Sequence, residues 1–211
     1  MTISFAGSRS IRADISGRPG RGLVVFAHGS GSSRHSPRNR KVAEVLEAAG
    51  FQTLLLDLLT EEEERVDVRT REHRFDIALL TDRVLEGLSW LRDQGHAEPI
   101  GLFGASTGAA AALRAAAVNP DDTKAVVSRG GRPDLAGDAL AAVMAPTLLI
   151  VGGEDSPILE LNQQALAELN SQSALVVVEG AGHLFEEAGA LERAADMATA
   201  WYVRHLGPPL L

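Results

Sequence analysis

Short, continuous apolar runs recur along the chain, separated by longer amphipathic stretches. The runs are of strand length and lack the polar alternation of a strand with one wet face, so we expect strands covered on both faces. They occupy residues 23–27, 51–59, 100–103, 124–128, 147–151 and 174–178. Residues 2–16 instead alternate loosely and break at Gly7-Ser8, which predicts an antiparallel hairpin.

The stretches between the runs carry apolar side chains at helical spacing. Ser36-Pro37 resembles a helix start, and a helical stripe continues from there to Gly50. Further helices are predicted from Ile77 to about Gly95, directly after Gly108, around 134–143, from Ser156 through Asn170, and over the C-terminal stretch that contains residues 191–202. Residues 60–74, TEEEERVDVRTREHR, form a charged excursion between two elements.

Alternation of strands and helices predicts an α/β protein with a mostly parallel, twisted sheet that carries helices on both faces. Neither an internal repeat nor a linker interrupts the pattern, so residues 1–211 are expected to form one domain. Only residues 130–146 separate the runs at 124–128 and 147–151. This insertion is too short for a large cap domain, so we expect a rather open site.

Composition narrows the class of protein. A chain of 211 residues with 45% hydrophobic content can bury a well-packed core. The sequence has no apolar run of membrane-spanning length and no secretory signal, and without cysteine it has no disulfide, thiol nucleophile or cysteine-ligated metal. We therefore expect a cytoplasmic protein without membrane association. A formal charge of −8 argues against nucleic-acid binding.

The sequence IGLFGASTG at 100–108 contains G-x-S-x-G, between an apolar run and an alanine-rich helix former. A strand that turns into a helix at a serine is typical of a nucleophile elbow, in which the flanking glycines permit close backbone crossings. A glycine-punctuated turn is the plainer interpretation of these five residues. The setting favours Ser106 as a catalytic nucleophile.

Other polar residues follow other predicted strands and should meet at the same edge of the sheet. Asp155 and His183 come after two late strands, and the order Ser, Asp, His is that of an α/β-hydrolase scaffold. His183 would be the general base for Ser106, and Asp155 would orient it. Glu154 is the rival acid, and either carboxylate could instead cap the following helix; we favour Asp155.

The backbone N–H groups of Thr107 and Ser30 are the predicted oxyanion hole, the second lying in the glycine-rich loop at 28–33. His28, which begins that loop, is better suited to shaping it than to acting as the base. No grouping of histidine and acidic residues has ligand-like spacing, so we expect neither a metal nor another cofactor.

The chain resembles α/β hydrolases of the dienelactone-hydrolase type over nearly its whole length. The resemblance rests on HGSGSSRHSPRN, GLFGASTGAAAAL, VVSRGGRPDLAG, LLIVGGEDSPILELN and GAGHLFEE. It implies the α/β-hydrolase fold and maps the catalytic serine, acid and histidine onto Ser106, Asp155 and His183. Dienelactone hydrolases proper use a cysteine nucleophile, which this chain lacks.

Several residues near the predicted sheet edge are candidate substrate contacts: Gly31, Arg34, Arg38, Arg129 and Arg132. One hypothesis is that some of the arginines receive a carboxylate or phosphate, which a guanidinium matches with two parallel hydrogen bonds. The alternative, which we favour, is that they pair with Asp57, Asp134 or the acidic excursion and stiffen the loops.

The sequence thus predicts a serine hydrolase that cleaves small-molecule carboxylic esters through an acyl-enzyme. A thioesterase, an amidase or peptidase, or an acyltransferase would use the same residues, and sequence does not separate them. A hydrolase-like binding module without turnover is the alternative of a different class. Oligomeric state is not predicted.

Overall fold

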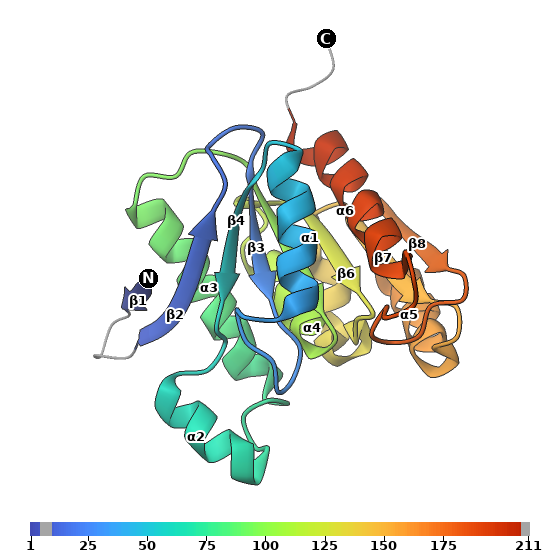
Figure 1. The fold of residues 1–211 in the computed structure, drawn as a ribbon, viewed down its shortest axis with the longest axis horizontal. Coiled ribbons are helices and arrows are strands. Elements are labelled where there is room, and N and C mark those ends of the chain that lie inside the picture. Colours follow the sequence, from blue (N-terminus) through green and yellow to red (C-terminus); the bar gives the residue numbers. More distant parts are fainter. Residues whose placement is uncertain (5–9, 208–211) are drawn as a thin grey trace.

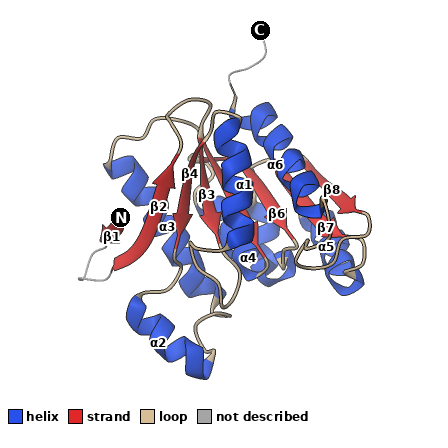
Figure 2. Ribbon diagram, viewed as in Figure 1, coloured by secondary structure: helices blue, strands red, loops and turns tan. Residues whose placement is uncertain are grey.

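Eight strands form one sheet in the computed structural model, which describes residues 1–4 and 10–207 (Figures 1 and 2). The sheet order is β1-β2-β4-β3-β5-β6-β7-β8. The strands are β1 (Thr2–Ser4), β2 (Ser10–Ser16), β3 (Leu23–Ala27), β4 (Gln52–Leu56), β5 (Ile100–Ala105), β6 (Thr123–Arg129), β7 (Thr147–Gly152) and β8 (Ser173–Val178). Strands β3 to β8 are mutually parallel, and β2 pairs antiparallel with β1 and β4.

Helices cover both faces of this sheet (Figure 2). They are α1 (Pro37–Ala48), α2 (Glu61–Thr70), α3 (Ile77–Asp93), α4 (Thr107–Val118), the 3₁₀ segment η1 (Pro133–Ala142), α5 (Ser156–Glu168) and α6 (Ala190–Leu206). One core cluster joins side chains of α3, α4, η1 and α5 to one face, and a second joins α1 and α6 to the other. The predicted α/β-hydrolase fold, a mostly parallel sheet with helices on both faces and no large cap domain, is confirmed.

Strand β3 shows why the apolar runs are continuous. Val25 and Ala27 belong to the cluster under α3 and α4, whereas Val24 and Phe26 belong to the cluster under α1 and α6. Successive side chains of a strand point to opposite faces, so a strand covered twice needs apolar residues at every position. All five residues of β3 are buried.

Two helices differ from expectation. The charged excursion contains α2, whose start is fixed by a capping box between Thr60 and Glu63. The segment predicted as a short helix around 134–143 is 3₁₀, and Gly137 interrupts it with a φ of 55°. The strand predicted over 51–59 ends at Leu56, because the backbone and side chains that follow bond to the loop after β3.

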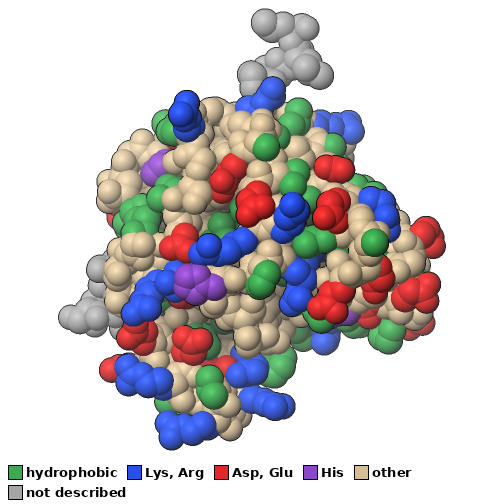
Figure 3. Space-filling view, in the orientation of Figure 1, with side chains coloured by type: hydrophobic (Ala, Val, Ile, Leu, Met, Phe, Trp, Pro, Cys, Tyr) green, Lys and Arg blue, Asp and Glu red, His purple; other side chains and the backbone are tan. Residues whose placement is uncertain are grey.

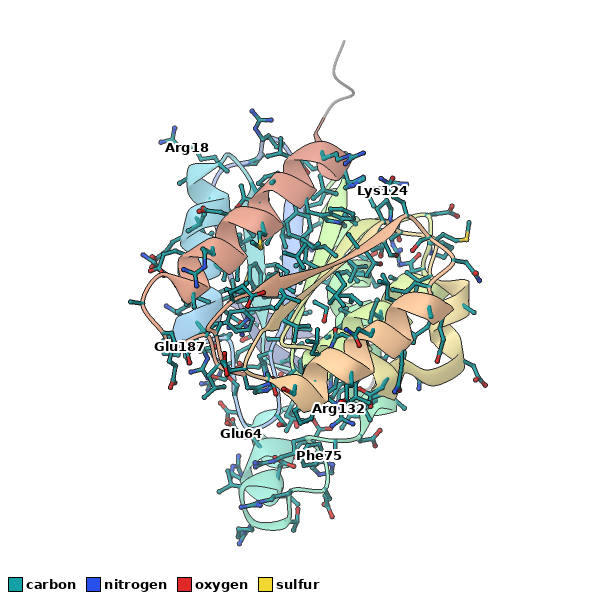
Figure 4. The ribbon with its side chains drawn as sticks, turned by 90° about the vertical axis from the view of Figure 1, so that its right-hand side faces the viewer. Arg18, Glu64, Phe75, Lys124, Arg132 and Glu187 are labelled. Atoms are coloured by element: carbon teal, nitrogen blue, oxygen red, sulfur yellow. The ribbon has the colours of Figure 1, made fainter. Side chains whose placement is uncertain are left out.

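The predicted antiparallel hairpin is confirmed as the pairing of β1 with β2, although its turn at Gly7-Ser8 lies outside the described residues. All strands from β3 onward end at one edge of the sheet, the edge from which α2 projects (Figure 1). In Figure 4, the labelled Glu64 and Arg132 lie toward this end of the molecule, and Arg18 and Lys124 lie toward the other.

Candidate active site

Ser106 occupies a sharp turn between β5 and α4. Its φ of 51° and ψ of −123° are sparsely populated for a residue with a side chain, and such strain is concentrated at functional sites. Neighbouring segments hold the turn, since Ser106 O accepts hydrogen bonds from Arg132 N at 3.0 Å and Ala109 N at 3.1 Å. The strained serine is therefore built into the fold.

The two glycines of G-x-S-x-G are required by close backbone crossings. A Cβ at Gly104 would lie 2.3 Å from Ala109 Cα, and one at Gly108 would lie 2.3 Å from Ala27 O. Both distances are far shorter than any van der Waals contact. The elbow predicted from the sequence is present in the structure, and a side chain at either glycine would displace Ser106.

His183 and Asp155 form a hydrogen-bonded pair at the same edge. His183 Nδ1 lies 2.6 Å from Asp155 Oδ2, which places the proton on Nδ1 and leaves Nε2 as the free ring nitrogen. Of the two neighbouring acids, Asp155 makes this contact, whereas the backbone N–H of Glu154 bonds to Ala181 O. Ser106 and His183 line one cavity of about 250 Å³. Among the hydrogen bonds of the described residues there is none between their side chains.

The loop after β3 lies directly beside the nucleophile. A Cβ at Gly29 would be 2.9 Å from Ser106 Cβ, so the loop touches the serine and Ser30 lines the cavity with it. Within the part of the chain that the structure describes, neither the Ser30 N–H nor the Thr107 N–H donates a hydrogen bond. Two free N–H groups beside a strained serine are what an oxyanion hole requires.

The His28 side chain joins this loop to the segment after β4 through hydrogen bonds. Its Nδ1 lies 2.9 Å from Gly29 O, and Leu58 N–H donates to its Nε2 at 3.1 Å, so the ring is neutral with its proton on Nδ1. Burial lowers the pKa of His28, which outweighs the opposing effects of the Gly29 carbonyl and of Asp57. The interpretation of His28 as a shaping residue agrees with these contacts.

Two of the candidate arginines are held in ion pairs, as the favoured interpretation expects. Arg34 bonds to Asp57 through its guanidinium and through its backbone N–H at 2.7 Å. Arg132 bonds to both carboxylate oxygens of Asp134 at 2.7 and 2.8 Å. Gly31 borders a separate cavity of about 110 Å³. These three residues are not among those that line the Ser106 cavity.

Arg38 and Arg129 do line that cavity. The Arg38 side chain, one-third exposed, contacts Glu186 at 3.3 Å. Arg129 is 6% exposed, and its guanidinium lies over the Phe185 ring at 5.6 Å. Burial, with a smaller contribution from the Arg38 charge, lowers the pKa of Arg129 to about 10.

Sequence reasoning did not single out Asn39 and Phe185. Asn39 is buried and accepts a hydrogen bond from Arg129 Nη2 at 3.4 Å, and Phe185 has a φ of 56° two residues after His183. The one sequence signal for each was its place near a residue already singled out. Asn39 follows Ser36 by three positions, and Phe185 follows His183 by two. Asn39 lines the cavity beside Arg129, and the Phe185 ring packs against the Arg129 guanidinium.

Clusters of three or more metal-binding side chains are absent from residues 1–4 and 10–207. Over the same residues, no helix has the length and apolar character needed to cross a membrane. The expectations of no metal and no cofactor remain predictions.

Comparisons with known proteins agree with this fold. The family model described as the dienelactone hydrolase family matches residues 11–204. A crystal structure of a dienelactone hydrolase from Anabaena variabilis is 52% identical, with a TM-score of 0.93 over 98% of this chain and 96% of that one. Est1E from Butyrivibrio proteoclasticus, solved with ferulic acid, has a TM-score of 0.82 over 97% of this chain and 98% of its own, but only 15% identity, so it shows the fold alone.

Two Mycobacterium tuberculosis proteins are also similar in sequence, one from strain CDC 1551 and one from strain H37Rv. Each is named "Putative phosphoribosyl transferase" and is 60% identical over 191 residues. The match covers 90% of this chain but only 42% of either relative. More than half of each relative therefore lies outside the part that resembles this chain.

Proposed function

Because the chain belongs to the dienelactone hydrolase family, we propose that it is a serine hydrolase that cleaves carboxylic esters through an acyl-enzyme. The observation that carries the proposal is the 2.6 Å contact between His183 Nδ1 and Asp155 Oδ2, in a histidine that shares a cavity with the strained Ser106. This arrangement leaves His183 Nε2 free to accept a proton from the serine.

In the first half of the reaction, Ser106 Oγ attacks the ester carbonyl while His183 Nε2 takes the hydroxyl proton. The negative charge moves to the carbonyl oxygen, where the N–H groups of Thr107 and Ser30 donate to it. The intermediate collapses, the alcohol leaves with the proton from His183, and the acyl group stays on Ser106. Asp155 stabilises the imidazolium formed in between.

In the second half, His183 takes a proton from water, and the resulting nucleophile attacks the acyl-enzyme. A second oxyanion forms in the same hole, and its collapse releases the carboxylic acid and returns the proton to Ser106. A thioester or an amide would follow the same path, and an alcohol in place of water would give acyl transfer. We favour water over an alcohol as the acceptor of the acyl group, because residues 130–146 form no large cap that would exclude water from the cavity.

The name of the Mycobacterium tuberculosis relatives suggests a second reaction, phosphoribosyl transfer. That name belongs to proteins of which the matched portion is only 42% of the length, so it does not carry phosphoribosyl transfer over to this chain. The side chains gathered at Ser106 suit acyl transfer to water, and we propose no phosphoribosyl transferase activity for this chain.

The proposal is tested by labelling the purified protein with a fluorophosphonate and reading the intact mass, with p-nitrophenyl esters assayed on the same preparation. We expect one adduct that is absent from Ser106→Ala. Asp155→Asn should lower kcat by about 10⁴-fold, as loss of the equivalent charge does in serine proteases. Glu154→Gln is the matched control and should retain full activity.

The labelling experiment can also contradict the proposed serine hydrolase. A protein that forms no adduct from about pH 6 to about pH 9, a range in which a histidine base becomes active, has no activated serine. The chain would then be a binding module with a hydrolase fold. Equal losses in Glu154→Gln and Asp155→Asn would contradict the assignment of the acid.

A further inference from the structure

Asn162 is a fully buried polar residue in α5, the helix that begins directly after Asp155. We infer that Asn162 is a positioning residue, which fixes residues 130–132, the bridging segment, between Ser106 and His183. The inference rests on the proposed function for the reaction itself. It adds a residue outside the triad that sets the separation of the nucleophile and its base.

An amide is an unexpected side chain at this position. Only Asn162 and Ala165 are buried among the residues of α5, and asparagine is a weaker helix former than leucine or alanine. Figure 3 shows charged side chains on the outer surface, where water solvates them, whereas Asn162 is 0% exposed. Its Oδ1 is buried without a hydrogen-bond partner among the described residues, which is costly. An apolar side chain would avoid this cost, so we attribute the role of the amide to its donor, Nδ2.

The donor joins α5 to the connection between β6 and β7. Asn162 Nδ2 donates to Gly131 O at 3.0 Å and to Ile158 O, one turn earlier on α5, at 2.8 Å. No backbone N–H of the described residues donates to Gly131 O. Gly131 is buried, and a buried carbonyl without a donor is destabilising. Asn162 therefore anchors the middle of the bridging segment.

The bridging segment bonds to two further elements. The Gly130 N–H donates to Ile150 O of β7 at 2.8 Å, and the Arg132 N–H donates to Ser106 O at 3.0 Å. The hydrogen bond from Asn162 lies between these two. A backbone group of each residue in the segment is thus fixed, and the central hydrogen bond comes from a side chain.

The bridging segment lies between the nucleophile and the base. On one side, the hydrogen bond of Arg132 reaches the backbone of Ser106. On the other, a Cβ at Gly130 would lie 3.0 Å from His183 O and 3.8 Å from His183 Cε1. Gly130 also lines the cavity that Ser106 and His183 share. A shift of the segment therefore changes the separation of Ser106 Oγ and His183 Nε2.

Two adjacent glycines give the bridging segment its path. Gly130 has a φ of 51°, and a Cβ at Gly131 would lie 1.9 Å from Ser128 Oγ and 2.6 Å from Ala109 Cβ. The segment thus packs closely against β6 and α4. Glycine has no side chain to restrict its backbone, so this path depends on hydrogen bonds from neighbouring elements.

The test removes the amide donor and measures catalysis and folding separately. Asn162→Leu keeps the branched shape of the side chain and removes both Nδ2 and the unpartnered Oδ1. We expect kcat for p-nitrophenyl acetate to fall by about 10- to 100-fold and KM to change by less than about twofold, since a misplacement of about 1 Å can cost about 10²-fold. Labelling of Ser106 by the fluorophosphonate should slow by a similar factor.

Asn162→Ser isolates the hydrogen bond to Gly131. Its hydroxyl can still donate to Ile158 O, as Thr81 and Thr199 donate to carbonyls four residues earlier on their helices. The serine side chain is too short to reach Gly131 O. This variant should lose as much of kcat as Asn162→Leu, and its result decides the matter if the leucine variant fails to fold.

Asn170→Ala is the matched control. Asn170 follows α5, and its Nδ2 donates to Ala141 O at 3.0 Å, so it makes the same kind of hydrogen bond to the same connection at an exposed position. Its kcat and its labelling rate should equal those of the native protein. A thermal melt of each variant reports folding. An equal loss of kcat in Asn170→Ala would mean that any loosening of this connection slows the reaction, and it would overturn the inference.

Hydrogen–deuterium exchange separates this inference from the proposed function. The Arg132 N–H should exchange at least about tenfold faster in Asn162→Leu and at the native rate in Asn170→Ala. Faster exchange in a protein that hydrolyses no ester would remove the hydrolase and still support the anchoring of the bridging segment.

Two results would retain the hydrolase and overturn the positioning role. One is an unchanged kcat in the folded Asn162 variants, at any rate of exchange. The other is a lower kcat without faster exchange of the Arg132 N–H, because Asn162 would then act by a route other than the bridging segment.

Discussion

His28 couples the shape of the loop beside the nucleophile to pH. Its Nε2 accepts a hydrogen bond from the Leu58 N–H. A proton on Nε2 would replace this hydrogen bond with two facing donors and no acceptor. Because the ring is buried and its pKa lies below the usual 6.5, the unfolded chain binds the proton more tightly than the folded one. Folding stability is then complete above about pH 6.5 and is lost as the pH falls toward the pKa of the folded state.

We predict that the free energy of unfolding decreases between about pH 7 and pH 5, with His28 contributing a slope of up to about 1.4 kcal/mol per pH unit. A His28→Asn variant should be less stable at pH 7 but should show a shallower decrease. Urea unfolding of both proteins at several pH values measures the slopes. Identical slopes would mean that His28 does not carry the acid sensitivity.

Specific side-chain hydrogen bonds help to fix the elements around the site. Tyr202 of α6 donates to Leu102 O of β5 at 2.7 Å, and a Cβ on Gly101 would meet its ring at 2.6 Å. Helix α2 is anchored by a polar side chain, since Asp67 is its one buried residue. That carboxylate accepts from the N–H groups of His73 and Arg74 at 2.9 Å and from Arg74 Nε at 2.7 Å. The contacts of Asp67 thus close α2 onto the segment that leads to α3.

We predict that Asp67→Asn opens α2 locally. Burial alone raises the pKa of Asp67, but its hydrogen bonds with Arg74 and His73 outweigh burial and hold the pKa below its usual value. Removing the charge should weaken the closure by about 1–3 kcal/mol. Hydrogen–deuterium exchange should accelerate over residues 60–76 and stay unchanged over residues 100–118.

Glu72→Gln is the control for this experiment, because the exposed Glu72 side chain contacts the neighbouring His73 side chain at 3.3 Å and makes no hydrogen bond with Asp67. Its exchange should match that of the native protein. Protection of α2 that persists in Asp67→Asn would show that the helix is held by other contacts.

At the scale of the whole molecule, hydrophobic cores on both faces stabilise the sheet. No large cap domain covers the edge where the parallel strands end. The serine cavity is small, about 250 Å³, and its lining is rich in polar residues such as Ser30, Ser36 and Asn39. A long acyl chain therefore has little apolar surface to cover. Substrate preference should therefore depend little on the length of the acyl chain.

We predict that kcat/KM for p-nitrophenyl esters stops rising at an acyl chain of about four carbons. Each methylene buried in an apolar groove would add about 0.8 kcal/mol, or about fourfold in kcat/KM. A series from acetate to octanoate measures the trend. A fourfold rise per methylene up to octanoate would reveal an apolar groove and contradict the polar cavity.

Local patterns determined much of this protein in advance. The apolar run of β3 could be predicted because a strand covered on two faces is apolar at every position, and the elbow because only glycine permits the crossings beside Ser106. Helix α2 was missed because it buries almost nothing, although Thr60 and Glu63 already had the spacing of a capping box. The positions of Ser106, Asp155 and His183 after three of the parallel strands followed from chain order alone.

Tertiary structure decided which charges meet. Asp155 rather than Glu154 faces His183, Arg34 and Arg132 reach carboxylates, and Arg129 reaches none. Periodicity and turn chemistry act over a few residues, so a sequence displays them directly. The partner of a side chain at a sheet edge depends on how loops from distant strands converge, and here that convergence left one buried guanidinium facing the nucleophile's cavity.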